Sequence, residues 1–139
     1  MRINEISADI RTAPQGYTLV SAFSDDLNCN VGMPKIMNEM FNITERVDVV
    51  KRYKNAKNIA KLDNLFLLLV KDTSYDAPIW NRLIDALAEL RDKCEKNGIK
   101  KLAMPKICTS AEGFDWDSVC DEIMNTFMLS DIDIVVYCR

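Results

Sequence analysis

The sequence predicts an α/β protein in which helices pack on both faces of a mixed sheet of about six strands. Short apolar segments alternate along the chain with segments of helical periodicity, and turn residues separate them. The clearest helix spans residues 79–96, and apolar strands at residues 65–70 and 102–104 flank it in the sequence. This alternation is typical of a three-layer α/β/α sandwich.

Composition favours one compact domain, residues 1–139, and excludes several classes of protein. Of the 139 residues 48% are hydrophobic, and only 4 are glycine and 4 proline, so the chain can bury a core and is not fibrous. The longest apolar run, residues 65–70, is too short to span a bilayer, and no export signal opens the chain. We expect a soluble, cytoplasmic monomer without membrane contact.

The inventory of reactive side chains restricts the chemistry. Five cysteines are scattered without a C-x-x-C pair, and there is no histidine. This argues against the usual zinc sites and a disulfide framework, and it excludes every mechanism with an imidazole base. We therefore expect no metal and no cofactor, and any catalysis must use Lys, Asp, Glu, Ser or Cys.

The N-terminal half contains four predicted strands and two predicted helices. The strands are expected at residues 3–6, 17–23, 58–62 and 65–70, and residues 63–64 form the turn between the last two. A helix opens within residues 29–33 and runs through Phe41, with Pro34 in the first turn, where proline is tolerated. A second short helix is expected at residues 43–53, and it ends in a basic segment.

The C-terminal half is organised around residues 101–116. The strand at residues 102–104 leads into a small-residue loop, 108–113, and Asp115 then caps a helix that continues to Phe127. A last strand is expected at residues 133–137. Strand–loop–helix units hold phosphate in many α/β proteins, because backbone N–H groups and the positive helix end converge there. The pattern alone is weak, since many such units bind nothing.

Five motifs occur along the chain in a specific order and spacing. They are Ala8-Asp9-Ile10; Ser24 with Asn30-Val31-Gly32-Met33; Lys71 with Pro78 and Trp80; Met104-Pro105-Lys106-Ile107 with Trp116; and Val136-Tyr137. In this joint arrangement the chain resembles the macrodomain family over nearly its full length, specifically the terminal ADP-ribose glycohydrolase type.

The resemblance implies a macrodomain sandwich whose partner is ADP-ribose or an ADP-ribosylated macromolecule. It implies that Asp9 accepts the adenine amino group and that Ser24 contacts the distal ribose. The ligand-binding residues that it implies are Asp9, Ile10, Ser24, Asn30, Val31, Gly32, Met33, Cys108, Thr109, Ser110, Ala111, Gly113, Phe114 and Tyr137.

The resemblance assigns catalysis to Lys71 and, at the position of the family's catalytic Asp, to Glu112. A lysine beside an apolar strand and a pocket can lose its proton and attack the anomeric carbon of the distal ribose, and an acid helps the leaving group depart. The function implied is hydrolysis of ADP-ribose from a modified protein or nucleic acid. From the residues alone, Lys71 is also explained as a solvent-facing strand end and Glu112 as a hydrated loop carboxylate.

Two loops depart from the family pattern. Asn30-Val31-Gly32 stands where the family has Gly-x-Gly, which is a mild change because Asn adopts positive φ more readily than most residues. Cys108-Thr109-Ser110 stands where the family has Gly-Cys-Gly, and it adds Cβ atoms where a pyrophosphate approaches. These changes favour an alternative function, a module that binds ADP-ribose or a related nucleotide without turnover.

A basic segment supports a third interpretation, a scaffold that contacts protein or nucleic acid. The net charge of −3 gives no overall attraction to nucleic acid, but five cations fall within a short segment. They could follow a nucleic-acid backbone weakly, or they could simply form a solvated face. The five are Lys51, Arg52, Lys54, Lys57 and Lys61.

Overall fold

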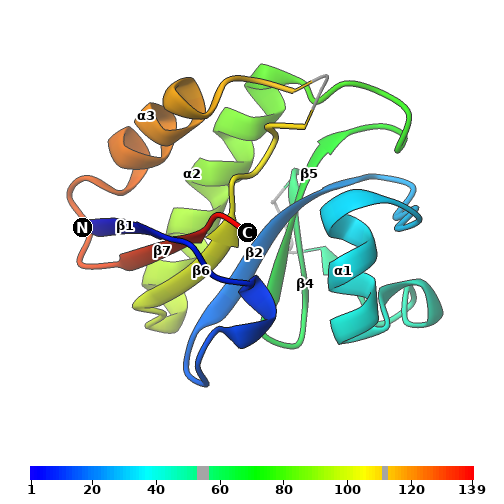
Figure 1. Cartoon of the computed structure of the whole chain (residues 1–139), viewed down its shortest axis with the longest axis horizontal. Helices are drawn as coiled ribbons and strands as arrows, with labels where there is room; N and C mark the ends of the chain where they lie inside the picture. Colours follow the sequence, from blue (N-terminus) through cyan, green and yellow to red (C-terminus); the bar gives the residue numbers. More distant parts are fainter. Residues whose placement is uncertain (53–56, 111–112) are drawn as a thin grey trace.

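A single sheet organises the molecule. The computed structural model describes residues 1–52, 57–110 and 113–139, and within these ranges seven strands form one sheet in the order β1-β7-β6-β2-β5-β4-β3 (Figure 1). The first five strands in this order are mutually parallel, whereas β4 runs antiparallel to β5 and β3 runs antiparallel to β4. The strands are β1 (Arg2–Ile6), β2 (Thr18–Ser24), β3 (Lys51–Arg52), β4 (Ile59–Leu62), β5 (Leu65–Lys71), β6 (Lys101–Pro105) and β7 (Asp133–Tyr137).

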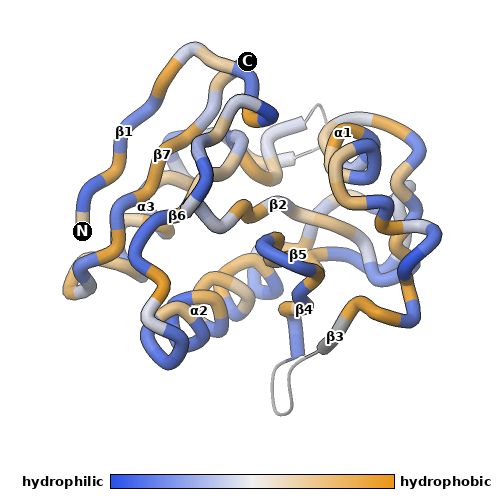
Figure 2. The backbone as a smooth tube through the Cα atoms, turned by 90° about the horizontal axis from the view of Figure 1, so that it is seen from below, coloured by the Kyte–Doolittle hydropathy of each residue, from blue (hydrophilic) through white to orange (hydrophobic). Residues whose placement is uncertain are grey.

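Helices cover both faces of the sheet, as the sequence predicts. The helices α2 (Trp80–Asn97) and α3 (Trp116–Phe127) lie on one face, and α1 (Gly32–Phe41) lies on the other with the 3-10 turns η1 (Ile10–Thr12) and η2 (Ile43–Glu45). Figure 2 shows α1 and α2 on opposite sides of β2 and β5. None of the helices in the described ranges is long and apolar enough to cross a membrane.

The strand β5 is the centre of two hydrophobic cores. Its residues from Leu65 to Val70 are all buried, because the even-numbered ones face α2 and α3 while the odd-numbered ones face α1 and η2. On one side Phe66 packs in a core that includes Leu87 and Val119, and on the other Leu67 packs in a core that includes Met37. A strand covered on both faces must be apolar throughout, which explains the uninterrupted hydrophobic run in the sequence.

The predicted strands and the three long helices are confirmed, but the short helix expected at residues 43–53 is wrong. Only the single turn η2 forms there, and the chain then extends into β3, which pairs antiparallel with β4. Asn42 ends α1 in the left-handed conformation, with φ 59°. The Arg46 guanidinium then binds the Asp63 carboxylate at 2.8 Å, so this segment is tied to the β4–β5 turn. Tyr53 lies outside the described residues.

Candidate functional site

A cavity of about 440 Å³ opens at the carboxyl ends of the parallel strands. Ser24, Lys71, Pro105 and Tyr137 line it from the ends of β2, β5, β6 and β7. The start of α1 and the loop after β6 complete the wall. In open α/β sheets ligands bind at this edge, so the cavity is the candidate site. Of the residues that the sequence predicts for the site, those lining it are Ser24, Val31, Gly32, Met33, Lys71, Cys108, Thr109, Ser110 and Tyr137.

The N-terminus of α1 forms one wall. Gly32 opens the helix with a φ of 66°, a left-handed conformation that glycine adopts without strain. Val31 at the cap position makes no side-chain capping hydrogen bond, so the wall presents backbone N–H groups at a positive helix end. Asn30 is exposed and does not line the cavity. Its φ is not positive, so the ability of Asn to adopt a positive φ is not needed at this position.

The loop after β6 forms the opposite wall, and its backbone is tightly folded. Cys108 has a φ of 59°, and its carbonyl accepts a 2.7 Å hydrogen bond from the Phe114 amide. A Cβ at Gly113 would collide with that same carbonyl, so only glycine fits this position. Ala111 and Glu112 lie outside the described residues. Asp115 caps α3 as predicted, because its carboxylate accepts from the Ser118 amide at 3.0 Å.

Lys71 reaches the cavity from the end of β5. Its Nζ donates to the Ser74 carbonyl at 3.2 Å, and its side chain is half-buried. The Asp26 carboxylate accepts from the Ser24 hydroxyl, and from the amides of Asn28 at 3.1 Å and Ser74 at 3.3 Å. These hydrogen bonds and the nearby Lys71 charge lower the pKa of Asp26. Sequence reasoning missed Asp26, although an Asp two residues after a Ser in a turn is a signal for such bonding.

Burial keeps the Cys108 thiol neutral. Desolvation raises the pKa of Cys108 to about 12, and the positive charge of Lys71 offsets this only in part. A thiol with such a pKa is a poor nucleophile at neutral pH, because only the thiolate attacks. The Cys108 thiol is therefore a poor candidate for a nucleophile in this cavity.

Besides Asn30, four predicted ligand residues with described positions lie outside the cavity lining. The Asp9 carboxylate accepts hydrogen bonds from the Arg11 guanidinium, and the shortest of them is 2.7 Å. This ion pair lowers the pKa of Asp9 to about 2. Ile10 is buried in the core. Phe114 packs edge-on against Trp80, with the ring centroids 4.9 Å apart, and Gly113 turns the loop behind Cys108. Of the four, only Asp9 presents a charged group close to solvent.

Cations line the cavity although the chain is acidic, and carboxylates lie close to two of them: the Lys106 ammonium is 3.8 Å from the Glu5 carboxylate, and Asp26 is near Lys71. Three cations line it, Lys71, Lys106 and Arg139, and no Asp or Glu is found among the described lining residues. Cations gathered in a cleft raise the local concentration of anionic ligands. Sequence reasoning did not single out Lys106 or Arg139 as ligand residues, because their convergence depends on strands β6 and β7 ending side by side. Among the described residues no cluster suited to a metal ion occurs.

The basic segment lies away from the cavity where it is described. Lys57 is exposed, and its backbone amide donates to Glu89 on α2. The Lys61 ammonium lies over the Phe66 ring, 5.4 Å from its centroid. The side chains of Lys51 and Arg52, and all of Lys54, lie outside the described residues. The two described cations thus form no continuous surface with the site.

Comparison with known proteins identifies the fold. No model of a protein family matches the sequence. The macrodomain of Mycobacterium tuberculosis DarG superposes with a TM-score of 0.74 at 18% identity, covering 99% of this chain and 97% of that one. The chain therefore has the macrodomain fold, as its motifs predict.

Two further similar proteins have names that mention ADP-ribose. The ADP-ribose glycohydrolase OARD1 of Bos taurus is 26% identical over 140 residues, which covers 98% of this chain and 91% of the relative. Thermosipho africanus DarTG, solved in complex with ADP-ribose, superposes with a TM-score of 0.75 at 14% identity, covering 99% of this chain and 42% of that one.

Proposed function

We propose that the protein binds ADP-ribose in the cavity and hydrolyses it from a modified protein or nucleic acid. The observation that carries this proposal is the charge of the cavity: Lys71, Lys106 and Arg139 line it with no described carboxylate, beside a helix N-terminus. A diphosphate is the ligand chemistry that such a wall favours. The similarity to a protein named ADP-ribose glycohydrolase supports the hydrolytic part.

The proposed pose follows the two walls. The pyrophosphate lies between the backbone of Gly32 and Met33 and that of Thr109 and Ser110. The distal ribose is then next to Ser24 and Lys71, and adenine extends toward Asp9. Asp9 can accept the adenine amino group while it holds Arg11, because a carboxylate has about four acceptor positions.

The proposed reaction uses Lys71 as nucleophile. The neutral amine attacks the anomeric carbon of the distal ribose, so that an N–C bond forms and the bond from that carbon to the macromolecule breaks. Glu112 donates the proton that the leaving group takes up, and water then hydrolyses the lysine adduct to release ADP-ribose and restore the amine. A covalent route of this kind divides one difficult substitution into two easier ones.

A binding module without turnover is the second candidate. It is favoured by the loop after β6, where Cys108 and Ser110 place Cβ atoms in the cavity wall that faces the proposed pyrophosphate. In this case the same residues bind ADP-ribose and Lys71 acts only as a cation. For either function we infer an intracellular setting, because all five cysteines are free.

Calorimetric titration with ADP-ribose tests the proposal that the cavity is a nucleotide site. We expect saturable 1:1 binding by the wild type and weaker binding by Lys106→Ala, because Lys106 lines the cavity. Lys35→Ala is the matched control, since Lys35 is exposed on α1 and does not line the cavity. A folded wild type that shows no binding at about millimolar ligand, a concentration that detects even weak complexes, would refute both candidate functions.

A further inference from the structure

We infer that Arg82 is a positioning residue that fixes Lys71 relative to Ser24 by clamping the ends of β5 and β2 from outside the cavity. The inference rests on the proposed function, because it gives Arg82 a role in the reaction of Lys71. It concerns a residue on α2 that is not among the described residues lining the cavity.

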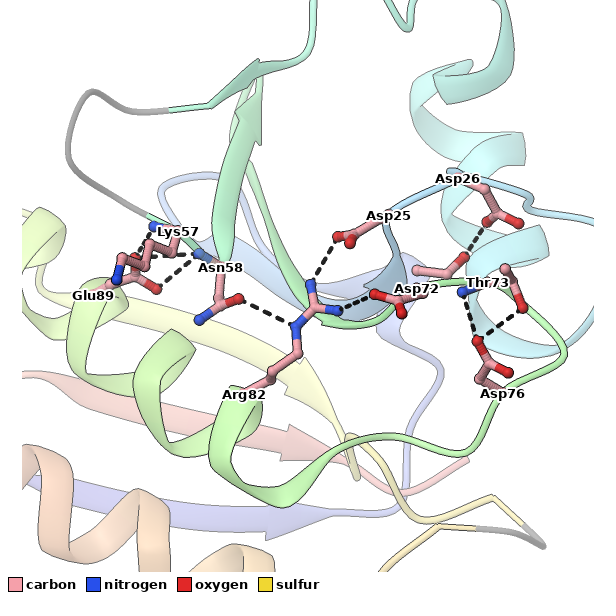
Figure 3. A network of polar contacts seen from close by, with 10 residues as sticks. Asp25, Asp26, Lys57, Asn58, Asp72, Thr73, Asp76, Arg82 and Glu89 are labelled. Carbon is pink, nitrogen blue, oxygen red and sulfur yellow. Dashed lines mark hydrogen bonds and ion pairs between the residues drawn. The ribbon is translucent and has the colours of Figure 1, made fainter.

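The Arg82 guanidinium joins three segments that are distant in sequence. One terminal nitrogen donates to the Asp25 carboxylate at 2.8 Å, the other donates to the Asp72 carboxylate at 3.1 Å, and Nε donates to the Asn58 side-chain oxygen at 3.2 Å. Figure 3 shows the guanidinium pointing between these three side chains from α2. A planar fork with fixed donor directions suits this task, whereas a lysine ammonium could not reproduce it.

The two carboxylates that Arg82 binds flank the residues of the site. Asp25 directly follows Ser24, and Asp72 directly follows Lys71. Ser24 is paired with Lys71 across the two strands, just past an irregularity in the register, and the Asp25 amide donates to the Lys71 carbonyl at 2.9 Å. Arg82 therefore neutralises and joins two like charges at the point where the paired strands end.

Burial favours the contacts of Arg82 with Asp25 and Asn58, whereas its partner Asp72 is largely exposed. The Arg82 side chain is only 19% exposed, so its ion pairs are less screened than those of a surface arginine. Its partner Asn58 is buried. The backbone amide of Asn58 donates to the two carboxylate oxygens of Glu89 on α2, at 3.0 and 3.2 Å. The network thus attaches both strand ends to α2, which is packed against β5.

Loss of the clamp should affect reaction more than binding. Without the guanidinium, Asp25 and Asp72 repel each other and the ends of β2 and β5 gain freedom, so the Lys71 amine departs from its position beside Ser24. A displacement of about 1 Å at a reacting group can lower a rate by about a hundredfold. The pyrophosphate walls at α1 and after β6 receive no contact from Arg82 among the described residues.

The experiment compares Arg82→Met and Arg82→Lys with Arg91→Met as the matched control. Arg91 lies on the same helix and donates to the Thr126 carbonyl, away from the cavity. We expect Arg82→Met to lower kcat for ADP-ribose release by about tenfold or more, with the Kd for ADP-ribose changed by less than about threefold. Arg82→Lys should fall between Arg82→Met and the wild type, and Arg91→Met should match the wild type.

A second readout does not depend on turnover. Trace acetylation of lysines, quantified by mass spectrometry, reports how accessible the Lys71 amine is relative to exposed Lys35. We expect the Lys71/Lys35 ratio to rise about threefold in Arg82→Met, because local loosening exposes a half-buried amine, and to stay unchanged in Arg91→Met. Asp72→Ala, which removes the exposed carboxylate that accepts from Arg82, replaces Arg82→Met if that variant does not fold.

The outcomes separate the two proposals. A folded clamp variant with wild-type kcat and a wild-type acetylation ratio overturns the role of Arg82. A wild type that releases no ADP-ribose refutes the proposed hydrolysis, and in that case a raised Lys71 ratio in the clamp variant still supports the positioning of Lys71 by Arg82.

Discussion

At the scale of single residues, local partners set the chemistry of each side chain. Asp9 and Cys108 are both titratable residues predicted to bind the ligand, and their pKa values are shifted in opposite directions. The Arg11 guanidinium lowers the pKa of Asp9 to about 2, whereas desolvation raises the pKa of Cys108 to about 12. At neutral pH the first is therefore an anion and an acceptor, and the second is a neutral thiol that fills space.

Asp9 provides the first residue-scale prediction. Asp9→Ala should weaken ADP-ribose binding by about 1–3 kcal/mol, because a charged hydrogen-bond acceptor is lost. Its folded pKa of about 2 lies below the ordinary value of 3.8 for an Asp side chain, so the carboxylate stays ionised as the pH falls through 3.8. The difference in Kd between wild type and variant should then be the same at pH 7 and pH 5, as measured by calorimetry. Equal affinity of the two proteins at pH 7 would show that Asp9 does not contact the ligand.

At the scale of elements, hydrogen bonds and one glycine constrain the described residues of the loop after β6. Cys108 in this loop has a positive φ. Its carbonyl accepts a hydrogen bond from the Phe114 amide, and the Gly113 amide donates a hydrogen bond to the Ser110 carbonyl at 2.8 Å. The backbone thus turns back on itself between β6 and α3. A loop of this kind can present N–H groups to a ligand only if its turn is intact.

Gly113→Ala tests that requirement. The added Cβ would collide with the Cys108 carbonyl, which belongs to the backbone and cannot rotate away. We expect the free energy of unfolding to fall by about 1–3 kcal/mol and ADP-ribose binding to be lost. Gly98→Ala is the control, since Gly98 has a φ of 65° with nothing within 4 Å. It should cost about 1 kcal/mol of stability and leave the Kd unchanged; equal Kd values for both variants would contradict the loop's role.

The sequence is sufficient to predict the long elements, because their signals are local. The helical periodicity in residues 80–97 and the apolar run of β5 each report burial directly. The segment after Ile43 is different, since its conformation depends on the contact of Arg46 with Asp63 and on pairing of β3 with β4. Long-range contacts of that kind leave no local pattern.

At the scale of the whole molecule, the parallel strands bring residues from four parts of the chain to one cavity. The predicted placement of Ser24, Lys71 and Tyr137 at strand ends is confirmed, and all three line the cavity. Lys106 and Arg139 were not predicted as cavity residues, because a single lysine or arginine near a strand end has no sequence signature. The Arg82 clamp was missed for the same reason: its three partners lie in separate segments.

Attack of Lys71 on the distal ribose is tested most directly by measuring release of ADP-ribose by Lys71→Ala. The measurement is single-turnover release from ester-linked and nucleobase-linked substrates, with the Kd for free ADP-ribose determined on the same samples and Lys35→Ala as the control for loss of a lysine. We predict that Lys71→Ala lowers release by about a hundredfold or more while the Kd changes by less than about threefold, and that Lys35→Ala behaves as wild type. Release by Lys71→Ala at the wild-type rate would contradict the lysine mechanism.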